Sequence, residues 1–240
     1  MDFVTIRREL LYSMQEIASQ MSKVILVDYY DKVAKEDRYI LAMFEDAYRS
    51  VIMFCLAIQN TAISQSGVLL RQFLEQTAIC YILVSHPELK QDYMDHYKTR
   101  LDLADLNKAK QIKEIAKKYN IPNDPNALTF MDYGWIKFEN PRDCNEEGMI
   151  RYAGFDDIIS WKKKYLDKLA HSSFASIGFV SEDNSFPIVD NFVEIASKLF
   201  DHLCCGFHNL TKFAFVFDDV DLFNGKFRKL YEAYQVPKTN

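Results

Sequence analysis

Apolar residues recur at three- and four-residue steps along most of the chain, which is the spacing of amphipathic α-helices. Over residues 3–27 this pattern is carried by Val4, Leu10, Leu11, Met14, Ile17, Ala18 and Met21. The same period predicts further helices over residues 37–59, 65–85, 88–119, 156–175 and 189–215, and a short last helix near Tyr234. Pro87 supplies a start signal for the helix that follows it. The pattern therefore predicts an all-α fold, a helical bundle of about six or seven helices.

The region near residues 120–154 breaks this pattern. Turn-forming residues gather there: Pro122, Pro125, Gly134, Pro141, Gly148 and Gly154. We expect a long irregular excursion with short helices at most. No internal repeat, low-complexity tract or linker divides the chain. The sequence thus predicts a single helical domain over residues 1–240, with core helices roughly at 37–119 and 156–215.

Composition supports long helices around a well-filled core. The 240 residues include only 7 Gly and 6 Pro, while aromatic residues make up 14%. Aromatic rings fill cores by default, although they also suit a stacking surface. The formal net charge is -5. A general electrostatic attraction to nucleic acid or to anionic membranes is therefore excluded, and such binding would need a local basic patch.

Cysteine usage and the N-terminus favour a cytoplasmic protein. The five cysteines form no CxxC pair and are odd in number, which is typical of reduced core residues. The first residues carry charge throughout and lack the apolar segment of a signal peptide. The longest uncharged stretch, residues 50–70, contains Gln59, Asn60, Ser64, Gln65 and Ser66. Two helices meeting at a turn fit it better than a membrane span.

A single charged pair interrupts the uncharged helix over residues 65–85. Arg71 and Glu75 are the charged residues between Thr61 and Ser85. At about 100° per residue Glu75 lies about 40° from Arg71, on a face shared with apolar side chains. We expect this face to be buried or to line a cleft. A buried charge is costly unless it is paired. The pair therefore favours a functional role, and a salt bridge that only fixes helix packing is the structural alternative.

His171 is the expected companion of this pair. It ends an amphipathic stretch and is followed by two serines. Imidazole is the usual proton-transfer group near neutral pH, although a lone histidine at a helix end is more often structural. Four nearby lysines, expected to be largely solvated, place positive charge close to it: Lys162, Lys163, Lys164 and Lys168. We predict that Arg71, Glu75 and His171 converge in space.

These residues carry a family resemblance. Arg71 and Glu75 in an apolar helix, followed far along the chain by Tyr165, His171 and a serine, resemble a bacterial helical family classed as a domain of unknown function. That family is distantly similar to the HEPN superfamily of helical nucleotide-binding and RNase domains. The resemblance covers roughly residues 37–176. It implies a helical fold, a homodimer and candidate catalytic residues Arg71, Glu75 and His171, with Tyr165 and Lys164 in support.

The resemblance departs from the superfamily's RNase motif at one residue. In that motif an arginine precedes a histidine on one helix, with four to six residues between them, and two such motifs meet in a dimer. Here Lys164 precedes His171 with six residues between. A lysine does not reproduce the planar fork of arginine. The departure favours binding over RNA cleavage.

Other residues that could bind a metal ion have a simpler structural explanation. Asp201, Cys204, Cys205 and His208 can share a helical face and are metal-capable, but their segment is largely apolar. Asp92 and His96 stand four residues apart in a charged run that is expected to be exposed. There is no Walker A loop, GxGxxG, GxSxG or HExxH motif. We therefore expect no metal and no cofactor.

Two functions follow. The first is a helical binding or regulatory module, expected to be a homodimer, in which the cluster of Arg71, Glu75 and His171 recognises a small anionic ligand or secures the core. RNA is a second candidate ligand. The alternative is a HEPN-like ribonuclease or nucleotide-acting enzyme of a defence or toxin system, so the sequence leaves enzymatic activity open. We expect no membrane association.

Overall fold

The computed structural model describes residues 3–102, 113–114, 117–118, 132–167, 185–211 and 218–235. Within these ranges every regular element is a helix, which confirms the all-α prediction. The chain divides into two compact units, Met1–Val84 with Asp157–Asn240, and Ser85–Asp156. Each unit is described by itself below.

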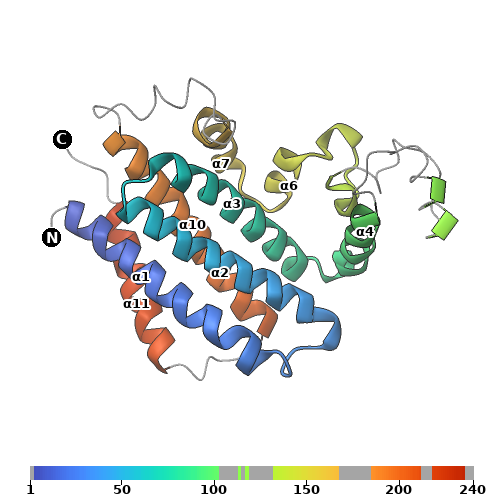
Figure 1. The fold of residues 1–240 in the computed structure, drawn as a ribbon, viewed down its shortest axis with the longest axis horizontal. Coiled ribbons are helices and arrows are strands. Elements are labelled where there is room, and N and C mark those ends of the chain that lie inside the picture. The colour runs from blue at the N-terminus through green and yellow to red at the C-terminus, as the bar shows by residue number, and fades with distance from the viewer. Residues whose placement is uncertain are drawn as a thin grey trace. The chain divides into compact units, whose positions relative to one another are not determined.

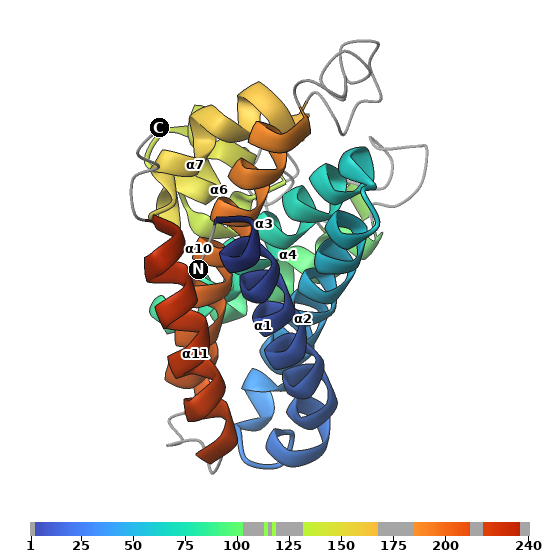
Figure 2. The same cartoon turned by 90° about the vertical axis from the view of Figure 1, so that its left-hand side faces the viewer.

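The first unit is built from long helices that pack along one another. α1 runs alongside α2 and α11, and α10 contacts α1, α2 and α11 (Figures 1 and 2). The π-helix η1 continues α1, and the π-helix η7 continues α7. The elements are α1 (Phe3–Val24), η1 (Ile25–Tyr29), η2 (Lys35–Asp37), α2 (Arg38–Gln59), α3 (Ile63–Ser85), α7 (Asp156–Trp161), η7 (Lys162–Leu166), α10 (Ser185–Thr211) and α11 (Asp218–Gln235).

Aromatic side chains form the centre of this unit. The Phe207 ring of α10 meets the rings of Tyr29, Phe44 and Tyr48 edge-on, with centroids 5.4, 5.5 and 6.3 Å away. Gly206 allows this close approach, because a Cβ there would lie 3.3 Å from the Phe44 ring. The high aromatic content is thus used largely for core filling, since edge-to-face contacts add to the free energy gained by burying each ring.

α2 and α3 meet at a tight turn, as the polar residues in this uncharged stretch predict. Thr61 adopts a left-handed conformation with φ 58°. The Ser50 hydroxyl donates to Gln76 Oε1 at 2.7 Å and links the two helices. α3 is long and apolar enough to cross a membrane, but half of its most apolar window is buried inside the fold. Core helices of soluble proteins share these properties, so this composition alone assigns no membrane role.

The second unit holds shorter helices: η3 (Pro87–Leu89), α4 (Lys90–Asp102), η5 (Gly134–Ile136), η6 (Pro141–Asp143) and α6 (Glu146–Tyr152). Trp135 is buried against Tyr93, with ring centroids 5.0 Å apart. Asn145 caps α6 by accepting the Gly148 N–H at 3.0 Å. The described part of the predicted excursion, residues 132–154, contains the short helices that its prolines and glycines indicate.

Candidate functional site

The wide helical turn η7 joins Lys162 to Asp167 twice. The Asp167 N–H donates to the Lys162 carbonyl, and Lys162 Nζ donates to Asp167 Oδ1 at 2.8 Å. In an α-helix residues five apart lie about 140° apart around the axis, at about 100° per residue. The wider π-helical turn, in which each residue bonds to the fifth one along, places both side chains on one side. The π-helix therefore creates this ion pair.

Lys162 is the buried member of the pair. Its side chain is 3% exposed, whereas that of Asp167 is 29% exposed. An ammonium group taken out of water requires a partner, and a carboxylate at hydrogen-bond distance is the strongest one a side chain offers. Leu166 beside it is fully buried, so this turn is anchored in the core.

A second cation reaches the same carboxylate from α3. Arg71 Nε lies 3.9 Å from Asp167 Oδ1, the oxygen that already accepts from Lys162. This distance is an ion pair and exceeds that of a hydrogen bond. The Arg71 side chain is 30% exposed, so solvent reaches the guanidinium. Two positive groups thus face one carboxylate from helices about ninety residues apart. π-Helical turns frequently occur at functional sites.

Glu75 follows Arg71 by one turn of α3, and both side chains are partly exposed. The face that they share passes from Val68, 45% exposed, to Ala78 and Ile82, which are fully buried. Arg71 and Glu75 therefore lie at the boundary between surface and core. This position keeps both side chains accessible to solvent.

The structure describes only some of the remaining predicted site residues. Tyr165 lies in η7, where its ring is 4.8 Å from that of Trp161. Lys164 belongs to the same π-helix, and its side chain lies outside the described part of the structure. His171 also lies outside the described residues. The convergence of His171 with Arg71 and Glu75 accordingly stays a prediction.

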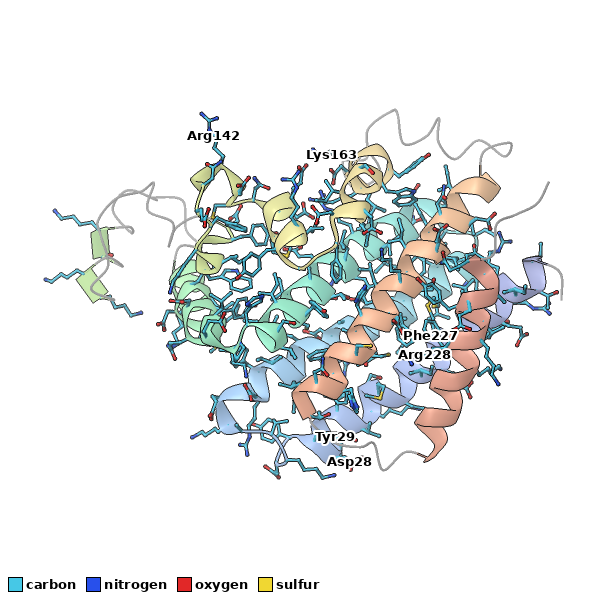
Figure 3. The ribbon with its side chains drawn as sticks, turned by 180° about the vertical axis from the view of Figure 1, so that it is seen from behind. Asp28, Tyr29, Arg142, Lys163, Phe227 and Arg228 are labelled. Atoms are coloured by element: carbon cyan, nitrogen blue, oxygen red, sulfur yellow. The ribbon has the colours of Figure 1, made fainter. Side chains whose placement is uncertain are left out.

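Lys162 and Asp167 are the site residues that the sequence did not single out. The lysine run was expected to be largely solvated, and Lys163 is indeed exposed on η7 (Figure 3). Lys162 is buried instead, because the π-helical turn points it inward toward Asp167. A five-residue spacing has no meaning in an α-helical pattern, so a search at three- and four-residue steps passes over it.

No family model matches this chain, and no curated protein or solved structure is similar to it. The arrangement of charges around Asp167 is thus the basis for a functional argument.

The metal-capable residues of α10 do not gather into a site. Cys204 Sγ accepts a hydrogen bond from the Tyr48 hydroxyl at 3.7 Å. The protein packed around the Cys204 thiol raises its pKa to about 12, which keeps it protonated. Among the described residues no group of three or more His, Cys, Asp or Glu side chains is arranged to hold a metal ion.

His96 differs from its expected exposed position. It is buried, and its Nε2 donates to the Asp132 carbonyl at 3.0 Å. Its sequence neighbour Asp92 pairs with Lys137. His96 is turned inward because it ties α4 to the segment before η5, and it therefore has a structural role.

Proposed function

We propose that this chain is a helical binding module in which Arg71 recognises a small anionic ligand beside the Lys162–Asp167 pair. The observation that carries the proposal is the convergence of two cations on one carboxylate oxygen. Lys162 is already satisfied by its hydrogen bond to Asp167. A second positive charge is unnecessary for burying Lys162, and it adds like-charge repulsion.

The pairing within η7 also sets the field that a ligand would meet. Because Lys162 compensates the charge of Asp167 at 2.8 Å, Asp167 compensates the more distant guanidinium only in part. Guanidinium is planar and binds carboxylate or phosphate through two parallel hydrogen bonds. Arg71 thereby combines solvent access with a chemistry that suits an anion.

The surrounding sequence adds positive charge. Residues 162–168 hold four lysines against one aspartate, although the whole chain carries a formal net charge of -5. An anion is therefore attracted locally, while the rest of the surface repels it on average. In this proposal Glu75 orients the arginine, and His171, four residues beyond Asp167 in the chain, donates a further hydrogen bond to the ligand.

A homodimer is part of the proposal, and its support lies on α2 and α3. Met53, Leu56 and Val68 are exposed there around a shallow apolar groove of about 520 Å³. Exposed apolar surface of this kind is typical of an interface between subunits. A two-fold axis would bring the same groove of two copies together. Sedimentation at several protein concentrations tests this, and Val68→Glu is expected to shift the protein toward the monomer.

The binding proposal is tested with inorganic phosphate and a nucleoside monophosphate in calorimetric titrations. Arg71→Met is expected to weaken binding at least about tenfold, as expected for a charge-assisted contact. Arg49→Met is the matched control, because Arg49 also pairs with a carboxylate, that of Glu45 in its own helix α2. Equal losses in both variants, or no loss in Arg71→Met, would reject the site.

Incubation with labelled RNA tests the alternative function. Cleavage by the wild-type protein that disappears in Arg71→Met and His171→Ala would identify a HEPN-like ribonuclease. Binding without cleavage supports the binding module.

A further inference from the structure

A second cavity lies elsewhere in the first unit, between α7, α10 and α11. Its volume is about 290 Å³. Ile158 and Ile195 provide its buried apolar part, and the other lining residues are Asp157, Trp161, Asn191, Glu194, Lys198, Tyr231 and Gln235. A few polar groups around an apolar floor between helices are typical of a small-molecule site, and the volume is at the low end of the usual range.

Two aromatic rings of this cavity are held in place from behind. The Trp161 ring packs edge-on against Phe192 at 5.5 Å and is tilted against Tyr165 at 4.8 Å. The Tyr231 ring is stacked on Phe227 at 5.9 Å, and Phe227 is itself buried against Phe200. Figure 3 shows Phe227 on α11. Indole and phenol faces fixed in this way attract cations through their negative π-surfaces. The walls are therefore preorganised for a positively charged group.

The cavity lining holds two carboxylates, Asp157 and Glu194, and one ammonium group, that of Lys198. Lys198 Nζ pairs with Asp157, so these two charges compensate each other. Glu194 is the other carboxylate in the lining, and among the described residues it forms no ion pair. An ammonium group of a ligand beside Glu194 would make the net charge of the cavity zero.

The end of α11 adds to this negative field. Tyr231 and Gln235 belong to its last turns, and no basic residue lies in the last turn. The C-terminus of a helix carries about half a negative charge and favours a nearby cation. Burial, followed by the carboxylates of Asp201, Glu194 and Asp157, raises the pKa of Tyr231. The phenol thus stays protonated in surroundings that stabilise positive charge.

We infer that this cavity binds a small organic cation, an amine or quaternary ammonium compound, between Trp161 and Tyr231 with Glu194 as its counter-ion. The three parts come from different helices, α7, α10 and α11, so the site exists only in the folded unit. This site is independent of the proposed anion site, because its lining includes neither Arg71 nor Lys162.

Choline and its uncharged carbon isostere, in which a carbon replaces the quaternary nitrogen, are the probes. Binding is followed by calorimetry and by tryptophan fluorescence, since Trp161 is one of two tryptophans in the chain and Trp135 is buried in the other unit. Choline is expected to bind saturably, and the isostere at least about tenfold more weakly, because cation–π attraction and the Glu194 charge are both lost.

Variants of the lining residues separate the effect of the Glu194 charge on choline binding from the effect of the cavity's shape. Glu194→Gln is expected to weaken choline binding about tenfold, a contribution of the size given by one close charge in a partly enclosed site. Glu232→Gln makes the same charge change one residue after Tyr231, outside the lining, and is expected to stay within about twofold. Tyr231→Phe keeps the ring and is expected to retain binding, whereas Trp161→Leu removes a wall and reduces it.

The inference is overturned if choline and its isostere bind equally well, or if Glu194→Gln binds choline like the wild type. It is also overturned if neither choline nor a short aliphatic diamine binds up to about 10 mM, a concentration that detects even weak small-molecule sites. Arg71→Met is expected to bind choline normally. A failure of the anion-site proposal would therefore leave this result intact.

Discussion

Two buried charges in the first unit are accommodated in different ways. Glu45 on α2 is 7% exposed and pairs with Arg49, one turn along the same helix, which is largely exposed. Lys162 is 3% exposed and pairs with Asp167 across a π-helical turn. Asp167 then also meets Arg71, which belongs to α3.

The difference indicates which charged residue is not needed to stabilise a buried charge. One neighbour in the same helix is enough to keep Glu45 inside the fold, and Asp167 does the same for Lys162. Arg71 is the additional member, because it is partly exposed and lies 3.9 Å from an oxygen that already accepts from Lys162. A charge kept near a site that is already balanced favours a role in binding.

Removal of Asp167 is expected to have the largest effect on stability. Asp167→Asn would leave the buried Lys162 ammonium without its counter-charge, which is expected to lower the free energy of unfolding by about 2–4 kcal/mol. Urea denaturation of the wild type and the variant measures this loss.

The double variant Lys162→Met with Asp167→Asn is the control. An apolar chain in place of the buried ammonium is expected to recover most of the loss, since replacing both members of a buried pair is often neutral. No recovery would mean that Asp167 stabilises the fold through other contacts.

Removal of Arg49 is expected to have an intermediate effect. Arg49→Met leaves the buried Glu45 carboxylate unpaired but close to the surface, so a loss of about 1–2 kcal/mol is expected. Glu45→Gln leaves an exposed arginine that water can solvate, and a smaller loss is expected. The reverse order of these two variants in urea denaturation would show that Arg49 acts through packing.

Removal of Arg71 is expected to change stability little. Because its side chain is partly exposed and lies beyond hydrogen-bond distance from Asp167, Arg71→Met should cost less than about 1 kcal/mol. Anion binding should nevertheless weaken at least about tenfold. A loss of stability equal to that of Asp167→Asn would instead make Arg71 a structural member of the cluster.

His202 extends the comparison to a side chain whose neutral form is favoured by burial. Burial lowers its pKa, opposed by Asp201 and Asp157 and aided by Lys198. The folded state then takes up a proton less readily than the unfolded chain, in which histidine titrates near about 6.5. Stability from this group is complete above about pH 6.5 and falls as the pH drops through the lowered pKa.

A pH series of urea denaturation curves tests this small effect. His202→Gln should flatten the stability profile between about pH 6.5 and pH 5, because the titrating group is gone. An unchanged slope in the variant would assign the pH dependence to other groups.

Helices with regular apolar periods were predictable, because the period is a local property. α2 and α3, at Arg38–Gln59 and Ile63–Ser85, lie within about two residues of their predicted bounds. Cys55 and Cys80 were expected in the core and are fully buried. The last helix is longer than predicted, since α11 spans Asp218–Gln235. Its acidic first turn favours a helix start, although Asn224 and Gly225 resemble a turn.

The candidate site was only half predictable. Arg71 was visible as a charge in an apolar helix, whereas Lys162 looked like one of several surface lysines. Its burial depends on a wide turn that tertiary packing imposes and on a partner at a non-helical spacing. The cavity around Glu194 was likewise invisible, because its two rings, Trp161 and Tyr231, come from two other helices, α7 and α11.

The π-helical turn also fixes the chain's register between its two proposed sites. Trp161 faces one cavity and Asp167 faces Arg71, with η7 between them. A π-helical turn holds about one residue more than an α-helical turn, so deleting one residue within η7 would allow ordinary α-helical bonding to resume. Everything after the deletion would then keep nearly its place around the helix axis, because four residues of an α-helical turn replace five of the π-helical turn. A single lost codon between Lys162 and Asp167 would therefore preserve both the helix and the ion pair, which would then join residues four apart in an α-helix.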